Sequence, residues 1–224
     1  MDFKMNKLNQ LILGFDFEQN FKNLDFYVSK SNSQAFNSIQ DWSKREKKFL
    51  NIIGDKFSGK SHLINIFLEK NKGLKIDATN LNDEFLKKMK FYEDIILEDL
   101  TLNINEKLLY TLINIVESEN KYLIITSQTP LVEMSFKLLD LHSRLKNFFL
   151  TKIENPDDDL MFALILKNLS DRQISIDKKL VDYIIKRIDR SYSKISDFIY
   201  KIDQISLKKK KSIDFKIIKE ALGE

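Results

Sequence analysis

Residues 54–61 read Gly54-Asp55-Lys56-Phe57-Ser58-Gly59-Lys60-Ser61 and fit the pattern G-x-x-x-x-G-K-S. A short apolar run, Phe49 to Ile53, precedes this stretch and ends at its first glycine, which is typical of a buried strand. Ser61 to Lys70 follows, with apolar residues at helical spacing. The strand before and the helix after are the local context that this pattern requires.

The loop residues suit phosphate chemistry. Glycine accepts positive φ and close backbone approach, so that successive N–H groups can surround phosphate oxygens, and the helix that follows adds its dipole. We expect Lys60 to neutralise β- and γ-phosphate oxygens and the Ser61 hydroxyl to ligate Mg²⁺. A chance turn is the alternative, but the chain has only five glycines and two stand at the required positions. Residues 54–61 therefore predict a site for ADP or ATP with Mg²⁺.

Two acids follow a second buried run, Asp94 to Leu97. We expect Glu98 to hold Mg²⁺ through water and Asp99 to orient the attacking water. The alternative is a solvated acidic turn after a strand. The order is unusual, because Asp is typical at the first position and Glu at the second. A water-orienting carboxylate that is one methylene short predicts slow intrinsic hydrolysis.

Composition excludes several kinds of site. The chain has no cysteine, which excludes disulfides and thiolate chemistry, and only two histidines, His62 and His142. No apolar run approaches the roughly 18 residues of a membrane span, and Met1 to Asn9 lacks the apolar stretch that is typical of a signal peptide. A net charge of +4 is too small to indicate nucleic-acid binding, and Lys208–Lys211 is more typical of a solvated loop. We expect a cytoplasmic protein without membrane partners.

The order of elements predicts an α/β domain followed by a helical one. A third apolar run at 121–126 and a helical pattern at 103–119 continue the alternation, which predicts a parallel sheet covered on both faces. After Leu150 the strand signals stop. We expect four helices: one beginning at Asn155-Pro156, with Asn155 as its cap, then 177–188, 193–207, and one capped by Asp214. The predicted parts are an arm (1–20), a nucleotide-binding domain (21–152) and a lid (153–224).

Several segments in this order resemble the AAA+ module of the DnaA initiator family, and more closely its short Hda-type members, the regulatory inactivators of DnaA. The segments are residues 25–32, 59–63, 124–130, 141–145 and 188–204. The resemblance spans about residues 8 to 222. It implies a P-loop NTPase sheet with a helical lid.

The resemblance also assigns roles to single residues. Arg144 matches an arginine finger, which acts in trans on a γ-phosphate held by a neighbouring molecule; an ordinary surface arginine is the alternative. Val28 lies in the segment that opens the nucleotide pocket. Lys194 aligns with the sensor 2 arginine but lacks its bidentate fork. Ser127 and Gln128 stand where sensor 1 has Ser-Asp. We expect His62 to be a packing residue.

The N-terminal arm contains Gln10-Leu11-Ile12-Leu13-Gly14-Phe15, which resembles a peptide that binds the β sliding clamp. Leu13 and Phe15 would fill an apolar pocket while Gln10 hydrogen-bonds at its rim. The alternative is an arm whose apolar residues pack on its own domain.

The function implied is regulation of replication initiation. Such a protein binds adenine nucleotide and the clamp, contacts DNA only through the clamp, and acts mainly by promoting the hydrolysis of ATP on DnaA, with a homo-oligomer possible. The chain ends at Glu224, soon after the last expected helix, so we expect no duplex-binding domain like that of DnaA. The alternatives are a helicase-loader type of ATPase and a DnaA paralog that acts on single-stranded DNA.

Overall fold

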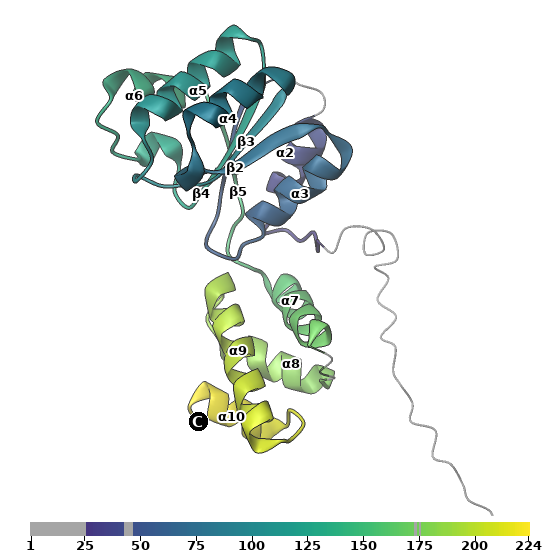
Figure 1. Ribbon diagram of the computed structural model, residues 1–224. Helices are drawn as coiled ribbons and strands as arrows, with labels where there is room; N and C mark the ends of the chain where they lie inside the picture. The colour runs from purple at the N-terminus through teal and green to yellow at the C-terminus, as the bar shows by residue number, and fades with distance from the viewer. Residues whose placement is uncertain (1–25, 43–46, 173, 175) are drawn as a thin grey trace, which may run out of the picture.

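The computed structural model describes residues 26–42, 47–172, 174 and 176–224 (Figure 1). A parallel sheet covered by helices is followed by a helical subdomain, which confirms the predicted fold class. The predicted clamp-binding residues Gln10, Leu13 and Phe15 lie outside the described residues, so their role stays a prediction.

One sheet of five parallel strands has the order β2-β3-β4-β1-β5. The central β1 lies between β4 and β5, and all five of its residues are buried. The strands are β1 (Phe49–Ile53), β2 (Gly73–Asp77), β3 (Asp94–Leu100), β4 (Tyr122–Ser127) and β5 (Phe149–Lys152).

The sequence patterns predicted the three inner strands and missed the two at the edges. In β2 no residue is fully buried, and in the four-residue β5 only Thr151 is. Neither edge strand therefore has the continuous apolar run that marks a strand buried on both faces. The expectation that strand structure stops at Leu150 was wrong, because β5 continues to Lys152.

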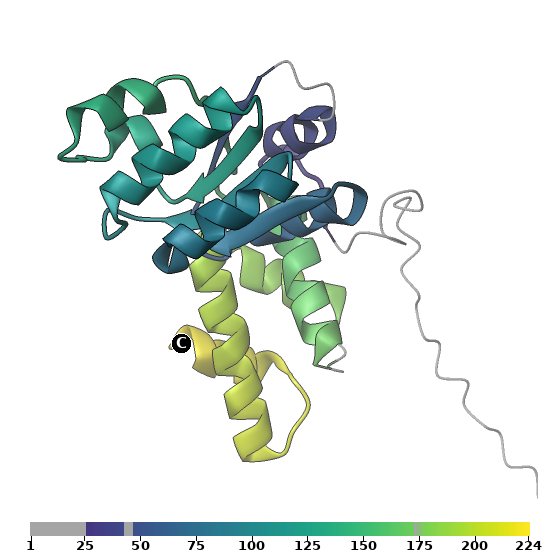
Figure 2. The same ribbon diagram turned by 45° about the horizontal axis from the view of Figure 1, so that its top comes forward.

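Helices cover both faces of the sheet (Figures 1 and 2). One face packs against α2 (Ser33–Asp41) and α3 (Lys60–Lys70), and the other against α4 (Asp83–Lys88), α5 (Glu106–Ser118) and α6 (Leu139–Leu145). The connections include the short 3₁₀ helices η2 (Ala78–Asn80), η3 (Met89–Phe91) and η4 (Leu131–Glu133).

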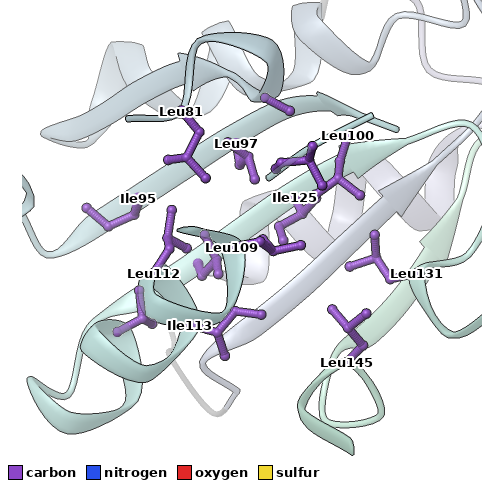
Figure 3. Close-up of a cluster of buried hydrophobic side chains, with 14 of the residues drawn as sticks. Leu81, Ile95, Leu97, Leu100, Leu109, Leu112, Ile113, Ile125, Leu131 and Leu145 are labelled. Atoms are coloured by element: carbon purple, nitrogen blue, oxygen red, sulfur yellow. The ribbon is translucent and has the colours of Figure 1, made fainter. Parts of the chain in front are cut away.

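Strand residues alternate between these two layers. Ile95 and Leu97 belong to the core under α5, whereas Ile96 belongs to the core under α3, as expected for side chains that alternate across a sheet. Leu109 and Leu112 of α5 pack over the first of these cores (Figure 3). The sheet is therefore buried on both faces, so a ligand can reach it only at its edges or at the ends of its strands.

The lid is formed by four helices with an apolar core of their own. Its last helix matches its prediction, because the Asp214 carboxylate accepts the Ile217 N–H at 2.9 Å. The predicted cap Asn155 was wrong: Asp157 accepts the Leu160 N–H at 2.8 Å, so the first helix begins two residues later than expected. The helices are α7 (Asp158–Asp171), α8 (Lys178–Ile185), α9 (Tyr192–Lys209) and α10 (Phe215–Leu222). Across the described ranges, none of the helices is both long and apolar enough to span a bilayer.

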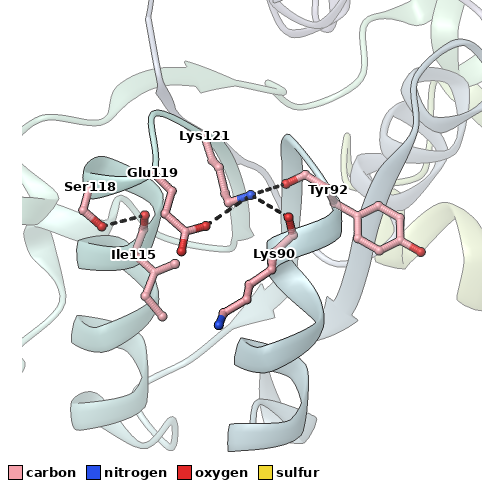
Figure 4. Close-up of polar contacts among 6 residues, drawn as sticks. All are labelled: Lys90, Tyr92, Ile115, Ser118, Glu119 and Lys121. Carbon is pink, nitrogen blue, oxygen red and sulfur yellow. Dashed lines mark hydrogen bonds and ion pairs between the residues drawn. The ribbon is translucent and has the colours of Figure 1, made fainter.

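A buried lysine fastens the amino end of the sheet (Figure 4). Lys121, 8% exposed, donates to the carbonyl oxygen of Tyr92 at 2.8 Å and pairs with Glu119 at 3.3 Å. These contacts tie the turn between α5 and β4 to the residues that enter β3. A buried ammonium is tolerated here because it has both a carbonyl and a carboxylate partner.

Replacing Lys121 with Met should lower the free energy of unfolding by about 1–3 kcal/mol, because the carbonyl of Tyr92 loses its charged donor. Urea denaturation measures the change. Lys107→Met, on the exposed side of α5, is the matched control and should leave the midpoint nearly unchanged. Equal midpoints for the two variants would contradict this role for Lys121.

Candidate nucleotide-binding site

The loop at residues 54–61 joins the carboxyl end of central β1 to α3. Gly59 has φ +93°, and a Cβ placed there would lie 3.1 Å from the ring of Phe26. At Gly54 a Cβ would lie 2.6 Å from the Ser58 hydroxyl. Both glycines are therefore required by this backbone path. Phe57 also has positive φ, +67°, although it is not glycine, and strain of this kind is concentrated at functional sites.

The ammonium of Lys60 lies inside the loop. It donates to the carbonyl oxygens of Gly54 (2.8 Å) and Asp55 (2.9 Å), and the residue is 6% exposed. Burial lowers the pKa of Lys60, and three carboxylates oppose that shift, in decreasing order those of Asp99, Asp55 and Glu98. A cation at the base of the loop is thus close to the acids that end β3.

The remaining loop residues differ in exposure. Asp55, Lys56 and Phe57 are exposed at the tip, where the Lys56 ammonium lies 5.1 Å from the centre of the Phe57 ring. The buried Ser58 hydroxyl has no hydrogen-bond partner within the described part of the chain. Ser61, near the amino end of α3, is exposed. The loop therefore presents backbone and polar groups at the carboxyl edge of the sheet, where ligands bind in open parallel sheets.

The two predicted acids end β3 at a change of register. Leu97 pairs with Ile125 but Leu100 pairs with Ser127, so β3 has one extra residue there. Asp99 has φ +52°, and its N–H donates to the Thr126 hydroxyl at 2.9 Å. The bulge turns this exposed carboxylate away from the regular strand path.

Glu98 is paired by a lysine that the sequence patterns did not single out. Its Oε2 lies 3.1 Å from the Lys75 ammonium of β2, and its side chain is 12% exposed. The other oxygen, Oε1, is buried and has no hydrogen-bond partner among the described residues. Glu98 therefore keeps one carboxylate oxygen for a further ligand.

Buried polar groups on the central strands join β1 to the end of β4 and to the residues after it. Asn51 of β1 donates to the Ser127 hydroxyl (2.9 Å) and accepts the Leu131 N–H (3.2 Å). The Ser127 hydroxyl in turn donates to the carbonyl of Thr129 (2.7 Å), while Gln128 is exposed. We missed Asn51; the signal was a lone polar residue within an otherwise apolar strand.

The lid is bonded to the segment that precedes α2. The Ser31 carbonyl accepts the Glu154 N–H at 2.8 Å, and the Ser31 N–H donates to Asp157 at 3.3 Å. Tyr192, at the start of α9, donates its hydroxyl to the Glu154 carbonyl at 3.0 Å. Two predicted pocket residues lie in these segments. Val28, before α2, is half-buried against the core under α3, and Lys194 is exposed in the first turn of α9.

His62 packs as expected, with its ring edge-on to Phe26 at a centroid distance of 5.4 Å. Arg144 is placed elsewhere. It lies on α6, in the layer opposite α3, and forms an ion pair with Glu117 of α5. The structure therefore does not bring Arg144 to the loop of its own chain. An action of Arg144 on a nucleotide would have to be on another molecule.

Mg²⁺ fits the loop as part of a nucleotide complex. The Ser61 hydroxyl and the free oxygen of Glu98 are hard oxygen ligands of the type Mg²⁺ prefers. Within the described ranges, no group of three or more His, Cys, Asp or Glu side chains could hold a metal by itself. Phosphate oxygens and water would have to complete the octahedron. Bound Mg²⁺ supplies charge neutralisation of the phosphates.

Comparison with known proteins gives a consistent picture. No family model matches the chain. The chromosomal replication initiator protein DnaA of Caldanaerobacter subterraneus subsp. tengcongensis is 24% identical over 89% of this chain and 51% of its own length. That of Helicobacter hepaticus is 23% identical over 88% of this chain and 49% of its own length. The chain thus spans about half the length of the curated relatives it matches.

Solved structures establish the fold. Domain III of the Thermotoga maritima replication initiation protein DnaA superposes with a TM-score of 0.75 at 19% identity, covering 89% of this chain and 94% of that one. AMPPCP-bound DnaA from Aquifex aeolicus gives 0.66 at 18%, covering 86% and 68%. A Thermotoga maritima RuvB mutant gives 0.67 at 14%, covering 89% and 71%. The chain has the AAA+ P-loop NTPase fold, with the arrangement seen in domain III of DnaA.

Tyr192 makes the joint to the lid sensitive to alkali. Burial raises its pKa to about 12, from 10.0 for a free phenol, and the nearby carboxylates of Asp157, Asp55 and Glu154 act in the same direction. Between these values the folded chain holds the phenolic proton more tightly than the unfolded chain. The stabilisation from this group is therefore complete below pH 10 and is lost as the pH rises toward about 12.

Tyr192→Phe should lose about 1 kcal/mol at neutral pH, with the hydrogen bond to Glu154. It should then lose less stability than the native chain between pH 10 and about 12. Urea unfolding across this range measures the difference, with the exposed Tyr200→Phe as control. Parallel curves for native and Tyr192→Phe would show that Tyr192 does not titrate as described.

Proposed function

We propose that this chain is a regulatory AAA+ protein of the Hda type. It binds ADP or ATP in the loop from Gly54 to Ser61, docks on the β sliding clamp through its N-terminal arm, and promotes the hydrolysis of ATP bound to DnaA. The result is fewer replication initiations. The observation that carries the proposal is the loop itself: two required glycines, a buried lysine and two strand-end acids meet at one edge of a DnaA-like sheet.

Nucleotide binding follows from the contacts of Lys60. Its ammonium already lies within the loop, bonded to two carbonyl oxygens that are weaker partners than a phosphate. A β-phosphate would accept hydrogen bonds from this ammonium and from the N–H groups at the start of α3. Two of the similar solved structures are DnaA proteins bound to AMPPCP, a nucleotide of the same class.

Weak turnover by the chain itself follows from its acids. Glu98 is paired with Lys75, and Asp99 is shorter than the glutamate usual at its position. We therefore infer that the chain acts chiefly on the nucleotide of its partner. In that reaction water attacks the γ-phosphorus and the bond to the bridging oxygen breaks, giving ADP and phosphate. Arg144, released from Glu117, would stabilise the negative charge that develops on the γ-phosphoryl oxygens.

A second candidate is a DnaA paralog that acts on single-stranded DNA. The observation that favours it is the likeness to DnaA bound to AMPPCP and single-stranded DNA, with a TM-score of 0.63 at 16% identity. A helicase-loader type of ATPase belongs with this alternative. The paralog would bind single-stranded DNA in a salt-sensitive way and would have no affinity for the clamp. The loader would show appreciable ATP turnover stimulated by DNA.

Lys60→Ala should weaken ADP binding by about tenfold to a hundredfold, because one charged contact to the phosphates is lost. Calorimetric titration with ADP measures the affinity. Lys56→Ala, which removes an exposed lysine from the same loop, is the control and should bind within about threefold of the native chain. ADP affinity unaffected by Lys60→Ala would place the nucleotide elsewhere or nowhere.

Arg144→Ala should lower the rate at which the chain stimulates phosphate release from ATP-loaded DnaA by about a thousandfold, the scale of an arginine finger. The assay contains DnaA, clamp loaded on DNA, and the variant under test. Arg172→Ala, on the lid, should stimulate as the native chain does. Full stimulation by Arg144→Ala would exclude the role of Arg144 as an arginine finger.

A Leu13→Ala/Phe15→Ala variant tests the N-terminal arm in parallel and should lose clamp binding.

A further inference from the structure

The pairing of β2 with β3 puts two carboxylates side by side. Asp77 stands directly opposite Glu98 across the two strands. Like charges in this position repel each other, because facing side chains on neighbouring strands are close. Lys75 lies two residues before Asp77 on the same face, since side chains alternate along a strand. It is thus the diagonal neighbour of Glu98.

Lys75 is held in this place from two directions. Its ammonium lies 3.1 Å from Glu98 Oε2 and donates to Asn65 Oδ1 at 3.0 Å. Asn65 belongs to α3, the helix that begins in the phosphate loop. The Lys75 side chain is 34% exposed and that of Glu98 is 12% exposed. The Lys75 ammonium therefore joins a side chain of β3 to a side chain of α3.

We propose that Lys75 is the internal counter-ion of Glu98 and makes nucleotide binding only weakly dependent on Mg²⁺. The inference rests on the proposed nucleotide site and adds a residue that sets its metal requirement. Lys75 pairs with Oε2 of Glu98, so only Oε1 of this carboxylate stays open to a metal-bound water. It also places a second ammonium, besides that of Lys60, among the acids of the site.

Charge balance gives the physical reason. Glu98, Asp99 and Asp55 are the carboxylates that act on Lys60, and Asp77 stands beside Glu98. Without Lys75 these four acids would face only the ammonium of Lys60 and the exposed Lys56 of the loop. A divalent cation would then be strongly attracted, and phosphates would be repelled unless it were present. With Lys75 in place, much of that attraction and repulsion is removed. The phosphates of ADP can bind without a metal to neutralise the acids.

The experiment compares ADP affinity in Mg²⁺ with ADP affinity in EDTA, by calorimetry on the full chain. For the native protein the two dissociation constants should agree within about threefold. For Lys75→Met the affinity in EDTA should fall, so that the ratio rises about fivefold to tenfold above the native ratio. Lys75→Arg keeps the charge and should restore a ratio close to the native one.

Lys87→Met is the matched control, because Lys87 is an exposed lysine on α4, in the other helical layer. It should leave the ratio unchanged. A Lys75→Met ratio equal to the native ratio would overturn the role of Lys75 while leaving the nucleotide site intact. A native ratio already as large as that of Lys75→Met would do the same. If the native chain binds no ADP in either buffer, the nucleotide site itself fails and this inference fails with it.

Discussion

The burial of β1 on both faces and along both edges is the constraint on which the rest of the structure depends. β1 is paired with β4 on one side and β5 on the other, and the α3 and α5 layers cover its two faces. The chain therefore leaves this strand at the carboxyl end of the sheet. The chain must then turn sharply into α3 while leaving backbone donors free. The glycines of the loop make this turn possible, and Lys60 closes it by bonding to carbonyls at its start.

Electrostatics at this edge is a balance among groups from four elements. Lys60 comes from α3, Lys75 from β2, and the acids from β3 and the loop. Because the ammonium of Lys60 is buried, its charge is sustained by the carbonyls and carboxylates around it rather than by water. The two carbonyl partners of Lys60 are uncharged, so a phosphate oxygen that replaced them would bind the ammonium more strongly.

The sequence was sufficient for those parts of the fold that are fixed by local pattern. Residues 54–61, the inner strands and the helix cap at Asp214 were predicted because each has a strong local signal. The edge strands were missed because half-buried strands lack a continuous apolar run. Asn155 was taken as a cap where Asp157 serves, since two good capping residues stood close together and only the bond to Leu160 distinguishes them. Lys75 could not be found, because its role arises from strand register, a property of the assembled sheet.

Ser31 has a mechanical consequence for the molecule. Its carbonyl accepts from Glu154 and its N–H donates to Asp157, so both ends of the connection to the lid are fastened to one residue. The segment containing Ser31 also leads into α2, which lies on the same face of the sheet as α3. Ser31 is therefore a hydrogen-bonding point shared by the connection to the lid and the segment that leads into α2. A tilt of the lid would therefore strain the two hydrogen bonds of Ser31 and, through them, the segment that leads into α2.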